Sequence, residues 1–300
     1  MQLLSRKAAD SAVAGRLWVV LAAVMWSSSG LFAKSPMWDD WPSDARGLLL
    51  AFWRAAFAGL LVLPAVRRPQ WSNKLVPMVI AFAVMNVTYL SAITLTTAAN
   101  AIWLQSTAPW WVFVLGVLVL REPISRAELV PLVLGGLGIA TILWHEMQSP
   151  SAAGVACGLT AGLAYAVVVL AMRALRDFDS AWLVVVNHLV TAAILLPYVV
   201  YRNIWPTPWQ LVVLAAFGFF QMGLPYLFFV RGLRSISSQE ATGIALLEPI
   251  LLPIWVYLVW GEVPAYWTVI GGGLILAGLV LRYTAVRSLG ADRATAAPLD

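Results

Sequence analysis

The sequence predicts an all-α polytopic membrane protein whose ten transmembrane helices form two inverted five-helix repeats. Composition, the spacing of apolar runs and the distribution of basic residues support this fold class. Of the 300 residues, 61% are hydrophobic and 11% are charged, against about 45–50% and about 25% in soluble domains. Ten spans of roughly 20 residues would occupy about two thirds of the chain, so little length remains for a soluble domain.

Ten apolar runs are long enough to cross a bilayer as helices. None of them alternates with the period of two that is typical of a lipid-facing barrel strand, so we expect helices throughout. The runs are Leu17–Ala33, Leu48–Val66, Leu75–Ser91, Ala101–Leu120, Leu129–Trp144, Gly154–Met172, Ala181–Tyr201, Leu211–Val230, Thr242–Trp260 and Trp267–Leu281.

Lys and Arg are distributed unevenly among the loops between these runs, as the positive-inside rule predicts. With a cytoplasmic N-terminus, three of the 19 basic residues face the other side (Lys34, Arg46 and Arg202) and Arg54 lies within a span. One miscounted span would invert every later loop, so the bias predicts an even span number with both termini cytoplasmic. The remaining fifteen, all on the cytoplasmic side, are Arg6, Lys7, Arg16, Arg67, Arg68, Lys74, Arg121, Arg126, Arg173, Arg176, Arg231, Arg234, Arg282, Arg287 and Arg293.

The two halves of the chain resemble each other at offsets of 133 to 140 residues. Each half holds five helices, and because five is odd, the halves must cross the membrane in opposite directions. Inverted repeats are typical of secondary transporters, whereas a duplicated structural scaffold is the alternative. The paired residues are Pro109 with Pro249, Leu118 with Leu258, Glu122 with Glu262, Gly138 with Gly278, Pro64 with Pro197, Arg54 with Asn187, Trp26 with Tyr165 and Lys34 with Arg173.

We therefore expect four segments in the chain. They are a cytoplasmic N-terminal tail (1–16), a first five-helix repeat (17–147), a second, inverted repeat (148–285) and a cytoplasmic C-terminal tail (286–300). The basic residues are scattered singly between apolar runs and form no basic face, so we expect no nucleic-acid partner.

Each half has a proline in its fourth helix followed thirteen residues later by a glutamate, Pro109 to Glu122 and Pro249 to Glu262, and then a Gly-rich fifth helix. This pattern resembles the EamA-type exporters of the drug/metabolite transporter superfamily, over roughly residues 16–285. Within that group the chain looks most like bacterial aromatic amino-acid exporters. The resemblance implies a multi-pass inner-membrane transporter, not an enzyme, without a cofactor, in contact with membrane lipid and either monomeric or dimeric. It would export aromatic amino acids and related small metabolites by alternating access through a central cavity.

Two charged residues, Arg54 and Glu248, fall within the predicted spans. Intramembrane charges are functional candidates because insertion of a charge is costly. Their depths should differ by roughly 12 Å in a core of about 30 Å, so we expect no direct ion pair. Glu248 would couple protons or bind an ammonium group, and Arg54 would act in gating or contact a carboxylate. The structural alternative is that Arg54 bonds backbone carbonyls and that Glu248 is neutral.

Polar and aromatic side chains gather on the first, third and fourth helices of each half, where lipid exposure would be penalised. Rings beside amide and hydroxyl donors would suit a ring-bearing zwitterion, although hydrogen bonds between helices are the alternative explanation. Pro109 and Pro249 are candidate hinges, or merely tolerated in the membrane. The expected substrate-binding residues are Trp26, Ser27, Asn86, Tyr89, Trp103, Gln105, Tyr165, Gln221, Tyr226 and Glu248.

Other features favour packing or exclude chemistry. Gly154, Gly158 and Gly162 form a small-residue stripe that we interpret as helix packing. With two histidines and one cysteine in the chain, we expect no metal site. An intramembrane enzyme would need a nucleophile and a base, and nothing in the sequence ties Ser29 to His188. A carrier of lipophilic cations stays open as an alternative, because Glu248 among aromatic rings could hold a cation.

Overall fold

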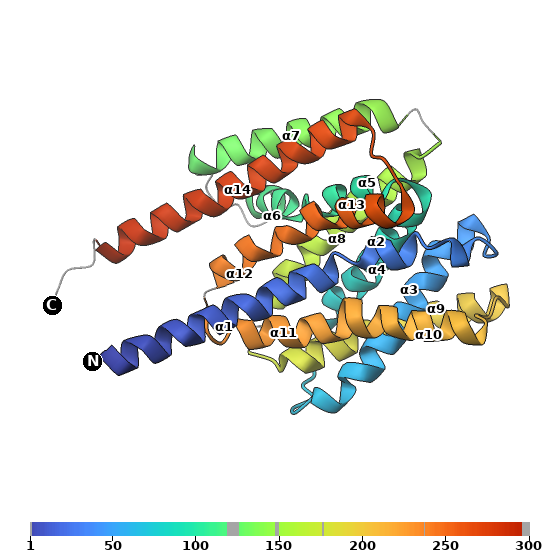
Figure 1. Cartoon of the computed structure of the whole chain (residues 1–300), viewed down its shortest axis with the longest axis horizontal. Helices are drawn as coiled ribbons and strands as arrows, with labels where there is room; N and C mark the ends of the chain where they lie inside the picture. Colours follow the sequence, from blue (N-terminus) through green and yellow to red (C-terminus); the bar gives the residue numbers. More distant parts are fainter. Residues whose placement is uncertain (1, 119–125, 148–149, 176, 237, 296–300) are drawn as a thin grey trace.

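The computed structural model describes residues 2–118, 126–147, 150–175, 177–236 and 238–295, and these residues form helices joined by short loops (Figure 1). No strand occurs among them, which confirms the all-α fold class. Arg121, Glu122 and Arg176, on which parts of the repeat and topology predictions depend, lie outside the described residues.

The first half of the chain contains long helices interrupted at defined points. Its elements are α1 (Gln2–Trp26), α2 (Ser29–Ala33), η1 (Pro36–Trp38), α3 (Ser43–Val62), η2 (Leu63–Ala65), α4 (Leu75–Leu95), α5 (Ala98–Gln105), α6 (Ala108–Leu118) and α7 (Arg126–Glu146).

The second half also contains long helices that are interrupted at defined points. Its elements are α8 (Ala152–Ala174), α9 (Ser180–Arg202), α10 (Pro208–Ala216), the π-helix η3 (Phe217–Gly223), α11 (Leu224–Gly232), α12 (Ser238–Ala245), α13 (Leu247–Trp260) and α14 (Tyr266–Thr295).

Within the described residues, eight helical stretches are long and apolar enough to cross a membrane. Two of the ten expected spans fall outside this set. The run Ala101–Leu120 is divided between α5 and α6, and Trp267–Leu281 lies in the shorter apolar stretch Tyr266–Arg282 of α14. The eight stretches are Ser11–Ala33, Ser43–Ala65, Leu75–Leu95, Leu129–Glu146, Ala152–Met172, Ser180–Arg202, Pro208–Gly232 and Gly243–Trp260.

Three of the helix interruptions follow from prolines. A proline has no N–H to donate to the carbonyl four residues earlier, and its ring clashes with that carbonyl. The last residue of α5 lies four positions before Pro109, and the last residue of α12 lies four positions before Pro249. The position four before Pro225 lies inside the π-helix η3, where the backbone takes a wider turn.

The interruption between α1 and α2 has a different cause. Ser27 and Ser28 donate their hydroxyls to the carbonyls of Val24 and Met25, at 2.7 and 2.6 Å. Serine side chains compete in this way with the backbone bonds of a helix, so α1 ends at Trp26 and α2 begins at Ser29.

Long helices from the two halves pack in pairs: α4 along α8, α3 along α9, α1 along α11 and α7 along α14. The pair α7 and α14 lies together at one edge of the bundle (Figure 1). The beginning of α1 and the end of α14 point to the same end of the bundle, which we call the terminal end, and the opposite end is the distal end (Figure 1).

The glycine stripe of α8 lies where other helices approach closely, in agreement with the packing interpretation. A Cβ on Gly154 would lie 2.8 Å from Thr96, and one on Gly158 would lie 3.1 Å from Leu104. A Cβ on Gly162 would lie 2.5 Å from the carbonyl oxygen of Leu104. Only residues without a side chain allow α5 to approach α8 this closely.

We expect Gly162→Ala to lower the thermal stability of the protein, because overpacking against a backbone carbonyl costs about 1–3 kcal/mol. Gly273→Ala is the matched control, since a Cβ there meets nothing within 4 Å and alanine is the better helix former. Melting of both detergent-purified variants measures the difference. A Gly162→Ala variant that is as stable as Gly273→Ala would contradict the close contact.

Candidate functional site

Arg54 lies in the middle of α3 and its side chain is 1% exposed. Its Nη1 donates to Oε1 of Gln221 in η3 at 3.1 Å, and its Nη2 donates to Oδ1 of Asn86 in α4. The ring centroids of Tyr89 and Phe217 lie 5.9 and 5.3 Å from the guanidinium carbon. Two neutral amides and two rings therefore surround the guanidinium, and no described carboxylate forms an ion pair with it.

The two amides extend these hydrogen bonds to further helices. Asn86 Nδ2 donates to the carbonyl of Ala51 at 3.1 Å, and Gln221 Nε2 donates to the carbonyl of Trp26 at 3.2 Å. The Trp26 carbonyl is available because α1 ends there. We call these five residues, from Trp26 to Ala51 through Gln221, Arg54 and Asn86, the Arg54 network. It connects α1, α3, α4 and η3.

The interruption between α1 and α2 is also attached to α4 and α13. Trp255 Nε1 in α13 donates to the hydroxyl of Ser27 at 3.0 Å, and the hydroxyls of Ser29 and Tyr89 lie 2.8 Å apart. Both serines are buried. The expected site residues Ser27 and Tyr89, both from the first half, thus lie at this interruption, and Ser27 is bonded to Trp255 of the second half.

Glu248 is the second residue of α13 and is partly exposed. It forms no hydrogen bond or salt bridge with the described residues. Its charge can still act on that of Arg54 through space.

Aromatic rings line the same region. Trp26 meets Tyr226 edge to face and lies against Phe229, with both centroid distances 5.3 Å. Tyr165 is 41% exposed although it lies in the middle of α8. His188 is 1% exposed and its Nδ1 lies 2.8 Å from the carbonyl of Val184, so it is a hydrogen-bonded helix residue.

Trp103, Gln105, Pro109 and Pro249 lie around the two proline-dependent interruptions. Trp103 Nε1 donates to the carbonyl of Pro249 at 2.9 Å, and its ring covers Gly272, where a Cβ would come within 2.1 Å of the ring. With 7% exposure, Trp103 positions the start of α13 beside Glu248. The carbonyl of Pro109 accepts a bond from Arg282, and Gln105 is half-buried at the end of α5.

A cavity of about 940 Å³ lies at the terminal end, between α1, α3, α9 and α11. We call it the vestibule. Tyr226, which meets Trp26 edge to face, is among its lining residues. The vestibule therefore reaches the aromatic rings of the expected site at Tyr226. Its lining also includes the four basic residues Arg67, Arg68, Arg231 and Arg234.

Asp179 holds one wall of the vestibule together as the N-cap of α9. Its Oδ1 accepts the N–H of Ala181 at 2.9 Å, and its Oδ2 accepts the N–H groups of Arg67 and Arg68 at 2.7 and 3.0 Å. Partial burial raises the pKa of Asp179, but these backbone donors outweigh that effect and hold the pKa below its ordinary value. The carboxylate therefore stays charged at neutral pH, and the contact weakens only as the pH falls through the lowered pKa.

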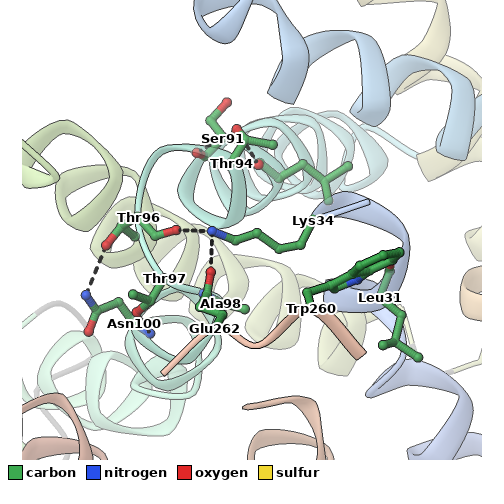
Figure 2. A network of polar contacts seen from close by, with 11 residues as sticks. Leu31, Lys34, Ser91, Thr94, Thr96, Thr97, Ala98, Asn100, Trp260 and Glu262 are labelled. Atoms are coloured by element: carbon green, nitrogen blue, oxygen red, sulfur yellow. Dashed lines mark hydrogen bonds and ion pairs between the residues drawn. The ribbon is translucent and has the colours of Figure 1, made fainter. Parts of the chain in front are cut away.

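An ion pair joins two loops at the distal end (Figure 2). Lys34 Nζ, at the end of α2, lies 2.6 Å from Glu262 Oε2 and donates to the carbonyl of Thr96 at 2.6 Å. Glu262 Oε1 accepts the N–H of Ala98 at 2.6 Å. We call these four residues the distal clasp. The side chains of the pair are each 20% exposed, so water screens them only in part.

Further bonds fix the loops of the distal clasp (Figure 2). Trp260 Nε1 donates to the carbonyl of Leu31 at 3.0 Å, and Asn100 Nδ2 donates to the hydroxyl of Thr96 at 3.0 Å. The two ends of the bundle are thus unlike: the terminal end holds a large cavity, and the distal end holds tied loops.

Sequence reasoning missed the pairing of Lys34 with Glu262. Glu262 entered only as part of the repeat, and Lys34 only as the partner of Arg173 in the repeat and as one of three basic residues outside the cytoplasmic loops. The available signal was that these opposite charges border spans on the same predicted side, where basic residues are few.

Three comparisons relate this arrangement to known proteins. The model of the EamA-like transporter family matches the chain twice, at residues 13–144 and 152–284. An uncharacterized transporter of Archaeoglobus fulgidus is 28% identical over 279 residues, which cover 90% of this chain and 96% of the relative. The uncharacterized transporter YxxF of Bacillus subtilis is 24% identical over 295 residues, covering 94% and 93% of the two chains.

A solved structure described only as a crystal structure of a protein has the same fold. It superposes with a TM-score of 0.62 at 17% identity and covers 89% of this chain and 96% of its own. Since the two family matches together span most of the sequence, the chain is a multi-pass membrane protein that belongs to the EamA-like transporter family.

Proposed function

We propose that this protein is a secondary transporter of the bacterial inner membrane that exports aromatic amino acids and related small metabolites. It would work by alternating access through a central cavity. The observation that carries the proposal is the asymmetry of the bundle around one polar site. The vestibule reaches Tyr226 from the terminal end, while the distal clasp ties the loops at the other end.

Ten spans in two inverted repeats are the architecture that we propose for this mechanism. An offset of 140 residues maps α5 (Ala98–Gln105) onto the bounds of α12 (Ser238–Ala245). Both helices end four residues before a proline. The helix pairs correspond as well: α4 of the first half packs along α8 of the second, and α11 of the second half packs along α1 of the first. In alternating access one repeat moves against the other, so equivalent contacts between the two repeats are expected.

The orientation follows from charge. The vestibule arginines belong to the basic majority that the positive-inside rule assigns to the cytoplasm. The terminal end would thus be cytoplasmic and the distal end periplasmic. In this orientation the structure corresponds to a state open to the cytoplasm, ready to load an exported substrate.

Aromatic substrates suit the rings around the site. Trp26 and Tyr226 form an edge-to-face pair, and the exposed ring of Tyr165 offers a free face. A second candidate, efflux of lipophilic cations, is favoured by the unpaired carboxylate of Glu248. An intramembrane enzyme is disfavoured, because the Ser29 hydroxyl pairs with Tyr89 and His188 bonds the Val184 carbonyl.

The aromatic preference is tested with Tyr165→Ala in liposomes. We expect phenylalanine counterflow to lose affinity by up to about tenfold, because a stacking contact contributes about 0.5–1.5 kcal/mol. Threonine counterflow should change less. Tyr257→Ala is the matched control, since Tyr257 is 54% exposed in α13 and lies outside the site. Equal losses for both amino acids in Tyr165→Ala would rule out stacking at this ring.

The orientation is tested with single cysteines in a Cys157→Ser background. Cysteine in place of Asp39 should react with an impermeant thiol reagent only from the periplasmic side, and cysteine in place of Arg68 only from the cytoplasmic side. The charge distribution motivates both expectations. Labelling of the Asp39 position from the cytoplasm would overturn the proposed orientation.

The gating role of the distal clasp is tested by charge reversal. Lys34→Glu should speed the reaction of a cysteine at position 165 with a reagent added from the distal side. We expect about tenfold or more, since hydrogen bonds to charged groups contribute about 1.5–3 kcal/mol. The swap Lys34→Glu with Glu262→Lys should restore slow labelling. Arg46→Glu is the control, because Arg46 pairs with the 72% exposed Asp39 at the same end. Unchanged labelling in Lys34→Glu would show that the clasp does not close the site.

A further inference from the structure

We propose that the site recognises the ammonium group of its substrate at Glu248 and does not bind a carboxylate, so that its substrate class is the aromatic amines. This inference rests on the proposed transport function and deepens it. An aromatic amine and the corresponding amino acid would be held by the same contacts. Arg54, for which the sequence suggests contact with a carboxylate, is instead a positioning residue that holds Asn86 and Gln221.

The first step is the enclosure of Arg54. Both terminal nitrogens of its guanidinium are used by Asn86 and Gln221, and its Nε is buried without a partner. The rings of Tyr89 and Phe217 lie on the guanidinium. A substrate carboxylate could reach this cation only by displacing two amides that are themselves bonded to the Ala51 and Trp26 carbonyls. Bidentate recognition of a carboxylate needs an accessible guanidinium fork, and with 1% exposure Arg54 presents none.

The second step is that Glu248, unlike Arg54, has no partner. Its carboxylate has no hydrogen-bond or ion-pair partner among the described residues, and it is partly exposed at the start of α13. Trp103 holds the carbonyl of the adjacent Pro249 at 2.9 Å, and Tyr226 lines the vestibule. A carboxylate in a membrane interior is stabilised by a cation with hydrogen-bond donors. A ligand ammonium supplies three such donors, as a lysine ammonium does.

The third step concerns the ligand's own carboxylate. Near Glu248 it would meet a like charge, and juxtaposed like charges disfavour binding. It could only point toward the vestibule, whose arginines lie at the wide terminal end. In that wet space an ion pair contributes little. The carboxylate therefore adds little affinity, whereas the ring does, because exposed aromatic faces such as Tyr165 attract both rings and cations.

Three probes separate these groups: phenethylamine, phenylalanine and 3-phenylpropionate. Binding is measured as a ligand-induced rise in the melting temperature of the detergent-purified protein over a concentration series. We expect phenethylamine to bind at least as tightly as phenylalanine, and 3-phenylpropionate to bind at least about tenfold more weakly. Tighter binding of 3-phenylpropionate than of phenethylamine would overturn the inference while leaving amino-acid transport possible.

Counterflow of labelled phenylalanine distinguishes failure of the proposed function from failure of the inference. Binding of phenethylamine without phenylalanine counterflow would refute amino-acid export and support the amine site. Phenylalanine counterflow that 3-phenylpropionate inhibits and phenethylamine does not would support export and refute the amine site. Absence of binding and of counterflow for all three probes would refute both.

Two variants assign the roles. Glu248→Gln should weaken phenethylamine and phenylalanine binding alike, by about tenfold or more, with Glu240→Gln as a matched control at an exposed ion pair with Arg16. Arg54→Lys should lower the melting temperature but leave the ratio of the two affinities unchanged. A tenfold rise in the preference for phenethylamine in Arg54→Lys would show that Arg54 binds the carboxylate. Should Arg54→Lys fail to fold, the comparison of the three probes on the unaltered protein still decides whether the site recognises the ammonium group or the carboxylate.

Discussion

The need to give each polar group inside a bilayer a partner is the constraint on which the rest of this structure depends. The two terminal nitrogens of Arg54 satisfy it through neutral amides rather than through a carboxylate. The consequence is that one buried cation fixes the relative positions of α1, α3, α4 and η3. The same arrangement leaves Glu248 without a protein partner, so the stabilisation of Arg54 and the availability of Glu248 are two results of one hydrogen-bond network.

Backbone interruptions place this network. Where a helix stops, carbonyls lose their internal donors and can accept bonds from side chains. Gln221 uses the Trp26 carbonyl at the end of α1, and Trp103 uses the Pro249 carbonyl near the start of α13. The interruptions are thus not defects in the spans. They provide the acceptors that orient the site, and they bring Glu248 to a helix start, where a negative charge is favoured by the helix dipole.

Much of this could be predicted from sequence because the signals are local. Apolar runs reveal the helices, and Pro109 and Pro249 predict interruptions in two of them. The rest depends on contacts between distant residues. The end of α1 is set by Ser27 and Ser28, which have no proline signal. The sequence predicts that the ring of Trp103 stacks on the substrate. In the structure its N–H bonds the Pro249 carbonyl and its ring packs on Gly272. Single-sequence patterns carry no information on such partners.

The charge of the site also constrains the energetics of transport. Without ligand, an ionised Glu248 would offset the charge of Arg54, so that reorientation of the empty protein in this protonation state would move no net charge at the site. A bound ammonium group adds one positive charge, and moving it against an inside-negative potential costs about 2.3 kcal/mol per 100 mV. An exporter of such a cation must offset this cost, and exchange for an inward-moving proton does so charge for charge. Glu248, the acidic group that holds the ammonium in our proposal, is also the group on which that proton would be carried, because its one carboxylate can bind either but not both.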